Sequence, residues 1–403
     1  MGKCGVCSSE IIKFLSLGRT PLANSFLKKE ELSKNEEYYP LDAGFCQKCA
    51  LVQLIYVVSP EKIFKNYVYV SSTSSTLRAH FKELSEKIIK RISKGSTVME
   101  IGSNDGTLLK NFARKQYNVL GIEPSSNIAE IANNNGVKTL NVFLNENSAK
   151  KIAKKYGKAD VVIGTNVFAH IPDLHGLLRA LKILLKPNGF AVFESPYLID
   201  LISKKEFDTI YHEHVYYLLI KPLKYLFGMH GMELFDAERT KIHGGSIRFY
   251  IGMKNKRKIN RNINDLLELE KKKGFHDIST YTRFAKDIIR LKKELTQLLG
   301  KLKREGNKIC GFGAPAKGNT LLNYMKIGRS TLDYIVDNSH YKQNLFTPGT
   351  KIPVLHPSRL LSDKPDYLLI LAWNFADEII EEQKEFARSG GKFIIPIPKP
   401  IVV

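Results

Sequence analysis

The chain has 403 residues, a hydrophobic content of 43% and a formal net charge of +22. The length is enough for about two or three domains, and the composition excludes a fibre, a disordered chain and a membrane helix of ~20 apolar residues. With this composition and no long apolar run, we expect a cytoplasmic protein. Because basic residues are spread along nearly every predicted helix without interleaved aromatic residues, we expect a small anionic substrate rather than a nucleic acid.

Four of the five cysteines form two Cys-x-x-Cys pairs near the N-terminus, Cys4 with Cys7 and Cys46 with Cys49. Two such pairs can surround one tetrahedral Zn²⁺ with four thiolates, so residues 1–62 are predicted to be a zinc-binding module. A closed four-sulfur site has no open position for a substrate, and its role is therefore structural. The alternative is two disulfides in a secreted protein, but we expect no signal peptide before Cys4.

An alternation of short apolar strands and helices is predicted within residues 63–255. After a first helix near 77–92, strands are expected at 98–101, 118–122, 160–163 and 190–193, and helices at about 107–115, 126–134 and 174–185. Strands separated by helices indicate parallel pairing in a doubly wound sheet.

A glycine loop, Glu100-Ile-Gly-Ser-Asn-Asp-Gly-Thr107, joins the first of these strands to the following helix. Its glycines let the backbone approach a ligand closely, and Glu123 at the end of the next strand can accept hydrogen bonds from a ribose. The loop lacks G-x-G-x-x-G and carries Asp105, which would repel a phosphate, so it favours S-adenosylmethionine over a dinucleotide or an ordinary turn. The expected cofactor-binding residues here are Glu100, Gly102, Ser103, Asn104, Asp105, Gly106 and Glu123.

A helical connector is predicted at 256–304, because apolar residues from Tyr281 to Leu302 recur at three- and four-residue spacing. We expect this helix to pack as core or to bridge domains rather than to form a coiled coil. A second Rossmann-like unit is predicted at 305–403, with its own glycine loop at 311–318. That loop departs from the dinucleotide fingerprint at its third glycine, which disfavours a nicotinamide oxidoreductase.

Several motifs occur in order along the chain. They are the four cysteines, the loop at 100–107, Asn166-Val-Phe-Ala-His-Ile-Pro-Asp173, Tyr211-His-Glu-His214, His243-Gly-Gly-Ser-Ile-Arg248 and the loop at 311–320. With them the chain resembles the three-domain, zinc-containing sugar C-methyltransferases, which transfer a methyl group from S-adenosylmethionine to a ring carbon of a nucleotide-linked 4-keto-deoxysugar. The resemblance implies an α/β protein with an N-terminal zinc-binding module, a central class I S-adenosylmethionine methyltransferase domain and a C-terminal Rossmann-like domain.

The resemblance also implies a catalytic cluster. Methylation of a carbon beside a ketone requires a base that removes a weakly acidic proton to give an enolate, and histidine is the residue most often used. The matching residues are His214 as base, Glu213 and Tyr211 as its neighbours, His170, Tyr69 in preference to Tyr67, and Asn166 at the cofactor. Alternatively, the two histidines beside Glu213 bind a metal, or the cluster is a structural polar network.

Three further residues are expected to contact the sugar nucleotide. Lys317 lies at the start of a predicted helix and could bind a diphosphate. His243 and Arg248 belong to the motif that resembles the family's sugar-pocket loop, although an arginine on a strand more often forms an ordinary salt bridge. We expect a monomer. The competing functions are methylation of RNA or of oxygen or nitrogen in a small metabolite, and non-catalytic binding.

Overall fold

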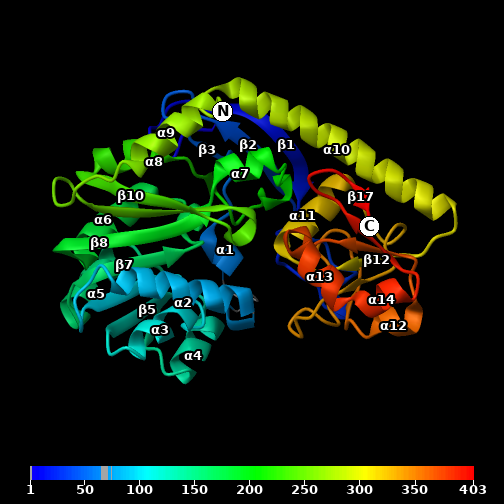
Figure 1. Ribbon diagram of the computed structural model, residues 1–403, viewed down its shortest axis with the longest axis horizontal. Coiled ribbons are helices and arrows are strands. Elements are labelled where there is room, and N and C mark those ends of the chain that lie inside the picture. Colours follow the sequence, from blue (N-terminus) through cyan, green and yellow to red (C-terminus); the bar gives the residue numbers. More distant parts are fainter. Residues whose placement is uncertain (1, 65–70, 74) are drawn as a thin grey trace.

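The computed structural model describes residues 2–64, 71–73 and 75–403, in which three β-sheets define an N-terminal module, a middle domain and a C-terminal domain (Figure 1). The long helix α10 (Ile278–Arg304) runs across the molecule from the middle domain to the C-terminal domain. Within the described ranges, no helix is both long and apolar enough to span a membrane.

The N-terminal module is a four-stranded antiparallel sheet whose last strand comes from a distant part of the chain. Its strands in sheet order are β1 (Ile12–Thr20), β2 (Tyr39–Phe45), β3 (Val52–Leu54) and β9 (Tyr216–Tyr217). The short helices of this part are η1 (Lys29–Glu31), α1 (Pro60–Phe64) and η2 (Ser71–Thr73). Strand β9 begins two residues after His214, so the predicted zinc module and the predicted catalytic motif are hydrogen-bonded neighbours.

The middle domain contains a seven-stranded sheet in the order β10-β11-β8-β7-β4-β5-β6. The strands are β4 (Thr97–Ile101), β5 (Asn118–Glu123), β6 (Thr139–Asn141), β7 (Ala159–Thr165), β8 (Leu185–Pro196), β10 (Met232–Thr240) and β11 (Ser246–Met253). Strands β4 to β8 are parallel, as the sequence predicts, and β10 and β11 add an antiparallel edge.

The helices that accompany this sheet occur between and after its strands. They are α2 (Ser75–Ile89), α3 (Thr107–Ala113), α4 (Ser126–Asn134), α5 (Glu146–Tyr156), η3 (Phe168–His170), α6 (Leu174–Leu184), α7 (Leu198–Ser203), η4 (Phe207–Thr209), α8 (Ile220–Met229), η5 (Ile242–Gly244) and α9 (Asn262–Lys272). The strand order reverses between β4 and β7, and the carboxyl ends of two such strands are where open α/β sheets bind ligands.

The C-terminal domain is a second doubly wound unit, with the sheet order β14-β13-β12-β15-β16-β17. Its strands are β12 (Ile309–Phe312), β13 (Ile335–Val336), β14 (Val354–Leu355), β15 (Tyr367–Ile370), β16 (Lys392–Ile395) and the antiparallel β17 (Ile401–Val402). Its helices are α11 (Ala316–Met325), α12 (Arg359–Asp363), η6 (Trp373–Phe375), α13 (Ala376–Glu382) and α14 (Lys384–Arg388). The strand order reverses between β12 and β15, so α11 and η6 begin at this second ligand-binding edge.

Helix α10 confirms the predicted long amphipathic helix and bridges two domains. Its buried face includes Tyr281, Phe284, Ile288, Leu291, Leu295, Leu299 and Leu302. The ring of Tyr281 lies 4.8 Å from Phe45 and 5.2 Å from Phe14, measured between ring centroids. The first half of the helix is therefore packed on the N-terminal sheet, while its far end leads into the C-terminal domain (Figure 1).

Arg248 lies on β11 and has no solvent-exposed surface. Its guanidinium donates to Glu194 at 2.9 Å, Glu238 at 2.9 Å and Glu83 at 3.2 Å. Burial of a charge in this way is tolerated because each guanidinium nitrogen has a carboxylate partner. The structure thus favours the ordinary salt bridge over the expected contact with a substrate phosphate.

We predict that Arg248→Met lowers the free energy of unfolding by about 3–5 kcal/mol, because it leaves the buried carboxylate of Glu194 without its cation. Urea denaturation measures this change. Arg261→Met is the matched control, since the Arg261 side chain is 90% exposed and its loss should change stability by less than about 0.5 kcal/mol. An Arg248→Met protein of parental stability but weakened substrate binding would support the phosphate contact instead.

Candidate active site

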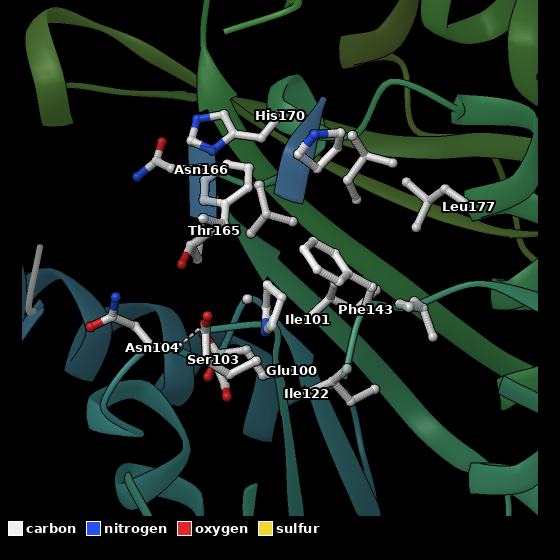
Figure 2. Close-up of a pocket in the computed structure, with 18 of the residues that line it drawn as sticks. Glu100, Ile101, Ser103, Asn104, Ile122, Phe143, Thr165, Asn166, His170 and Leu177 are labelled. Atoms are coloured by element: carbon white, nitrogen blue, oxygen red, sulfur yellow. Dashed lines mark hydrogen bonds between the residues drawn. The ribbon is translucent and has the colours of Figure 1, made fainter. Parts of the chain in front are cut away.

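A cavity of about 460 Å³ opens at the carboxyl ends of β4, β5 and β7. This volume lies within the ~300–1,000 Å³ of small-molecule sites. Figure 2 shows His170 and Asn166 at one end of the cavity, and Glu100, Ser103 and Ile122 at the other. The sequence-predicted residues at the strand ends therefore surround one space.

The glycine loop after β4 lies close against the residues that follow β7. Gly102 has a φ of +62°, and a Cβ built on it would lie 2.8 Å from a methyl carbon of Val167. No side chain other than hydrogen fits here, because Val167, which follows β7 and also lines the cavity, occupies the space that a Cβ would need.

Glu123 ends β5 and lines the cavity, as expected of a ribose-binding carboxylate. Its two carboxylate oxygens accept the backbone N–H groups of Asn104 at 3.0 Å and Ser125 at 2.9 Å. Burial raises the pKa of Glu123, and these two amides oppose the rise. Each oxygen has a second lone pair, so the carboxylate can still accept from a ligand hydroxyl.

Asp105 and Gly106, which the sequence assigns to cofactor binding, do not line the cavity. Asp105 accepts hydrogen bonds from the Thr107 hydroxyl at 2.7 Å and from the Ser72 N–H at 3.0 Å, so it fixes the start of α3 and the turn before α2. Gly106 has a φ of +78° and lies against Val137 on the side of the loop away from the cavity. Their observed contacts are structural.

Three buried polar atoms around the cavity have no hydrogen-bond partner among the described residues: Glu100 Oε2, Ser103 Oγ and His170 Nε2. Burial, and next the charges of Asp105 and Glu123, raise the pKa of Glu100 well above its usual value. A polar, cationic ligand would supply the missing partners and favour the ionised carboxylate. The chemistry of this lining therefore fits S-adenosylmethionine, whose sulfonium group would supply an electrophilic methyl.

The predicted base, His214, is held in one tautomer. Its Nδ1 lies 2.8 Å from the carbonyl oxygen of Thr209, which can only accept a hydrogen bond, so Nδ1 carries the proton. Its Nε2 is then the acceptor nitrogen, the one a base uses, and it accepts a hydrogen bond from the hydroxyl of Tyr211 at 3.0 Å. The imidazole is thus oriented by the backbone of the segment 209–215, which we call the active-site segment.

His170 connects this segment with the cavity. It lines the cavity, and its ring centroid lies 5.0 Å from that of His214. Burial, and secondly the His214 ring, hold the pKa of His170 well below its usual value, so the ring is neutral near pH 7. The N–H of Val215 donates to the carbonyl of Ala169 at 2.8 Å, which fixes η3 against the active-site segment.

The N-terminal module holds the other side of the active-site segment. Glu213 Oε1 accepts a hydrogen bond from the Asn24 amide at 2.6 Å, and His212 Nε2 lies 3.2 Å from the carbonyl of Pro40. Among the described residues, the four cysteines form the only metal-type cluster, so the alternative of a metal bound by the histidines beside Glu213 has no support. The expected Tyr69, with its alternative Tyr67, lies outside the described residues.

Lys317 lies at the second ligand-binding edge, on the first turn of α11. Its ammonium group is 4.5 Å from the centroid of the Trp373 ring and donates to the Asn374 side chain. The Trp373 indole N–H donates to Asp208 of η4 at 2.7 Å. Burial raises the pKa of Asp208 to about 6 and that of nearby Glu206 to about 7. The C-terminal edge therefore meets the middle domain directly before the active-site segment.

His243 belongs to η5, and the structure describes the backbone of this turn but not the His243 side chain. Gly244 and Gly245 follow with φ values of +91° and +136°. A Cβ at Gly244 would lie 2.4 Å from Glu206 Oε1, and one at Gly245 would lie 2.4 Å from the Asp200 carboxyl carbon. The two glycines are thus required by the close approach of buried carboxyl groups.

The four N-terminal cysteines fit a zinc ion. Sγ of Cys4 lies 3.5 Å from Cys49 and Sγ of Cys7 lies 3.4 Å from Cys46, and all four sulfurs lie within 4.8 Å of one another. Four sulfurs at ~2.3 Å from a tetrahedral Zn²⁺ would be roughly 3.8 Å apart. The backbone N–H groups of Val6 and Cys7 point at Cys4 Sγ from 3.5 Å and would stabilise a bound thiolate.

Family models match three successive parts of the chain. Their descriptions are "Putative zinc binding domain" for residues 4–64, "Methyltransferase domain" for 74–235 and "C-methyltransferase C-terminal domain" for 241–398. C-methyltransferase NovU of Streptomyces niveus is 35% identical over 405 aligned residues, which cover 100% of this chain and 96% of that protein.

Two other likenesses are limited to the middle of the chain. Ubiquinone biosynthesis O-methyltransferase of Ralstonia nicotianae is 30% identical over 103 residues, 25% of this chain and 43% of that protein. The crystal structure of magnesium protoporphyrin IX methyltransferase from Synechocystis with bound S-adenosylhomocysteine has a TM-score of 0.36 at 14% identity, covering 48% of this chain and 91% of that one. A likeness of this degree carries no argument about function.

We predict that Glu123→Gln weakens binding of S-adenosylhomocysteine by about 10- to 100-fold, because a hydrogen bond to a charged acceptor contributes ~1.5–3 kcal/mol. Isothermal calorimetry measures the dissociation constant. Glu130→Gln on the exposed side of α4 removes the same charge and should leave the constant unchanged. Equal affinities in the two variants would show that Glu123 does not bind the cofactor.

We predict that the parent chain holds one Zn²⁺ and that Cys49→Ser loses it, whereas Cys310→Ala in the C-terminal domain keeps it. Elemental analysis by mass spectrometry measures the zinc content. Loss of the ion should also speed hydrogen exchange at the Leu54 amide, which bonds to Val215, because β3 directly follows the second cysteine pair. If hydrogen exchange at the Leu54 amide were unchanged in zinc-free protein, the ion would not stabilise the active-site segment.

Proposed function

The chain belongs to the zinc-containing, S-adenosylmethionine-dependent C-methyltransferases, and we propose that it methylates a ring carbon of a nucleotide-linked 4-keto-deoxysugar through an enolate. The observation that carries this proposal is the imidazole of His214, with its Nε2 lone pair fixed next to the cofactor-side histidine His170. A carbon atom, unlike a hydroxyl or an amine, has no lone pair, so its methylation requires such a base.

The proposed reaction has two steps. Nε2 of His214 removes the proton from the carbon next to the ketone, and the electrons of the C–H bond move into the enolate. The enolate carbon then forms a bond to the methyl group as the methyl–sulfur bond breaks, which leaves S-adenosylhomocysteine. The proton on His214 is released to solvent afterwards.

Several neighbours support the role of His214. The carbonyl of Thr209 keeps the proton on Nδ1 in the neutral ring and would stabilise the imidazolium after proton transfer. The Tyr211 hydroxyl, 3.0 Å from Nε2, can move to a substrate oxygen when the substrate carbon approaches the base. A neutral His170 does not repel the cationic methyl donor, which an imidazolium would.

The C-terminal domain is proposed to bind the nucleotide part of the substrate. Support comes from Lys317, which is at the reversal of strand order in its sheet and packs over Trp373. Burial lowers the pKa of Lys317, and the charges of Asp208 and Glu206 oppose this effect. An anionic diphosphate would favour the charged form of Lys317 in the same way. Arg248 is not included, because its carboxylate partners already surround it. Monomeric state and cytoplasmic location stay predictions from the sequence.

We predict that His214→Ala lowers methyl transfer by about 10²- to 10⁴-fold, the usual contribution of a general base, while the dissociation constant of S-adenosylhomocysteine stays within about twofold. Transfer is measured with labelled S-adenosylmethionine and thymidine diphosphate 4-keto-6-deoxyglucose as probe. Without a methyl donor, the parent should exchange the proton next to the ketone with deuterium, and the variant should not.

His212→Ala is the matched control, because His212 is the neighbouring imidazole but bonds to Pro40 of the N-terminal module. It should retain deuterium exchange. If His214→Ala exchanged deuterium at the parental rate, His214 would not be the base. If the parent transferred methyl groups to RNA or to a hydroxyl but not to any nucleotide keto-sugar, the proposed substrate class would be wrong.

A further inference from the structure

A loop of the N-terminal module lies between the active-site segment and the C-terminal domain. The Asn319 side chain on α11 donates to the carbonyl of Ala23 at 2.7 Å. Leu27 and Phe346 exchange two backbone hydrogen bonds, of 2.9 and 2.8 Å. The Gly349 N–H donates to Glu36 at 2.7 Å. The Lys351 ammonium group donates to the carbonyl of Leu32 at 2.7 Å, so the described stretch from Ala23 to Glu36 is attached to the C-terminal domain at several points.

From the same loop, the side chain of Asn24 reaches the active-site segment. Its amide nitrogen donates to Glu213 Oε1 over 2.6 Å, across a separation of 189 residues in the chain. Asn24 is half-buried and Glu213 is 4% exposed, so the contact is largely shielded from water. The adjacent carbonyl of Ala23 is the acceptor of Asn319, so two consecutive residues contact two different domains.

This contact can fix the Glu213 carboxylate in one orientation. An amide N–H donated to a carboxylate favours the ionised form and restricts the rotation of the side chain. Glu213 lies directly before His214 in the chain. A change in the orientation of Glu213 can therefore shift the proposed base. A misplacement of about 1 Å at such a group can cost ~10²-fold in rate.

We propose that Asn24 is a positioning residue for methyl transfer, which holds Glu213 ionised and oriented and ties its orientation to the docked C-terminal domain. The inference rests on the proposed function of the active-site segment. It assigns to the N-terminal module a direct part in the active site, in addition to its zinc ion.

The link to the C-terminal domain follows from the geometry of the loop. The Ala23 carbonyl belongs to the peptide bond that joins Ala23 to Asn24. A shift of Asn319 on α11 would therefore move this peptide bond and, with it, the Asn24 side chain. Lys317 is two residues before Asn319 on the same helix. Whatever binds at Lys317 is thus connected through one turn of helix and one peptide to Glu213.

The test uses Asn24→Ala, which removes the donor, and Asn24→Asp, which keeps the shape but adds a like charge beside Glu213. Carbon-13 NMR of glutamate-labelled protein, with the Glu213 carboxyl signal assigned by Glu213→Gln, measures the pKa of Glu213 in each variant. We expect this pKa to rise in Asn24→Ala and to rise further in Asn24→Asp, because the first loses a bond that favours the anion and the second adds repulsion.

The second readout is kinetic, with the same thymidine diphosphate probe. Asn24→Ala should lower kcat by about 10- to 100-fold with an unchanged dissociation constant for S-adenosylhomocysteine. In Asn24→Asp the acid limb of the profile of kcat/KM against pH should move to higher pH. Ser25→Ala is the matched control, because Ser25 is the exposed next residue of the loop and should match the parent in both readouts.

A Glu213 pKa that is equal in the parent, Asn24→Ala and Asn24→Asp overturns the contact, and a moved pKa with parental kcat overturns its positioning role. A purely structural role would lower the melting temperature and leave the acid limb unmoved, which also contradicts the inference. Failure of the underlying function is distinguishable: the parent itself would then not methylate the probe, and the NMR titration would still decide whether Asn24 contacts Glu213.

Discussion

The structure depends on the pairing of β9 with β3, which joins the chain directly after the active-site segment to the N-terminal sheet. The Leu54 N–H donates to the carbonyl of Val215 at 2.8 Å, and the Val215 N–H donates to Ala169 at the same distance. One residue is therefore held from both sides, by the zinc-binding module and by the turn that carries His170. Segments far apart in the chain are ordered together, because these backbone groups are buried and would be costly to leave unpaired.

The two doubly wound sheets each bring one carboxyl edge close to the active-site segment. The edge between β4 and β7 forms the cofactor cavity. Next to it, the Asn166 N–H donates to the Glu194 carbonyl at 2.7 Å, and the Glu194 carboxylate is paired with the buried Arg248. The edge between β12 and β15 carries Lys317 and meets η4 through the bond from Trp373 to Asp208. Because η4 leads into the active-site segment, a ligand bound at either edge is adjacent to the same short stretch of chain.

The sequence predicts the local features of this arrangement well. The four cysteines, the parallel strands, the glycine loop and the apolar face of α10 are all recognised, because spacing and periodicity are local signals. It does not predict β9, a strand of two residues, or the contact of Asn24 with Glu213, since no pattern in the sequence reports contacts across 189 residues. Two residue assignments show the same limit. Asp105 was expected at the cofactor but is bonded to Thr107 at the start of α3, and Arg248 was expected at a phosphate but is enclosed by carboxylates. A charged residue in a motif indicates chemistry only when its partners are known.

The most direct measurement is a crystal structure of the protein with S-adenosylhomocysteine and a thymidine diphosphate 4-keto-deoxysugar analogue. We expect the cofactor sulfur and His214 Nε2 to lie on opposite faces of the sugar ring, with Nε2 within about 3.5 Å of the carbon next to the ketone, a near-attack distance. A sugar ring bound away from the active-site segment, or one that presents a hydroxyl rather than a carbon to the cofactor sulfur, would contradict this expectation.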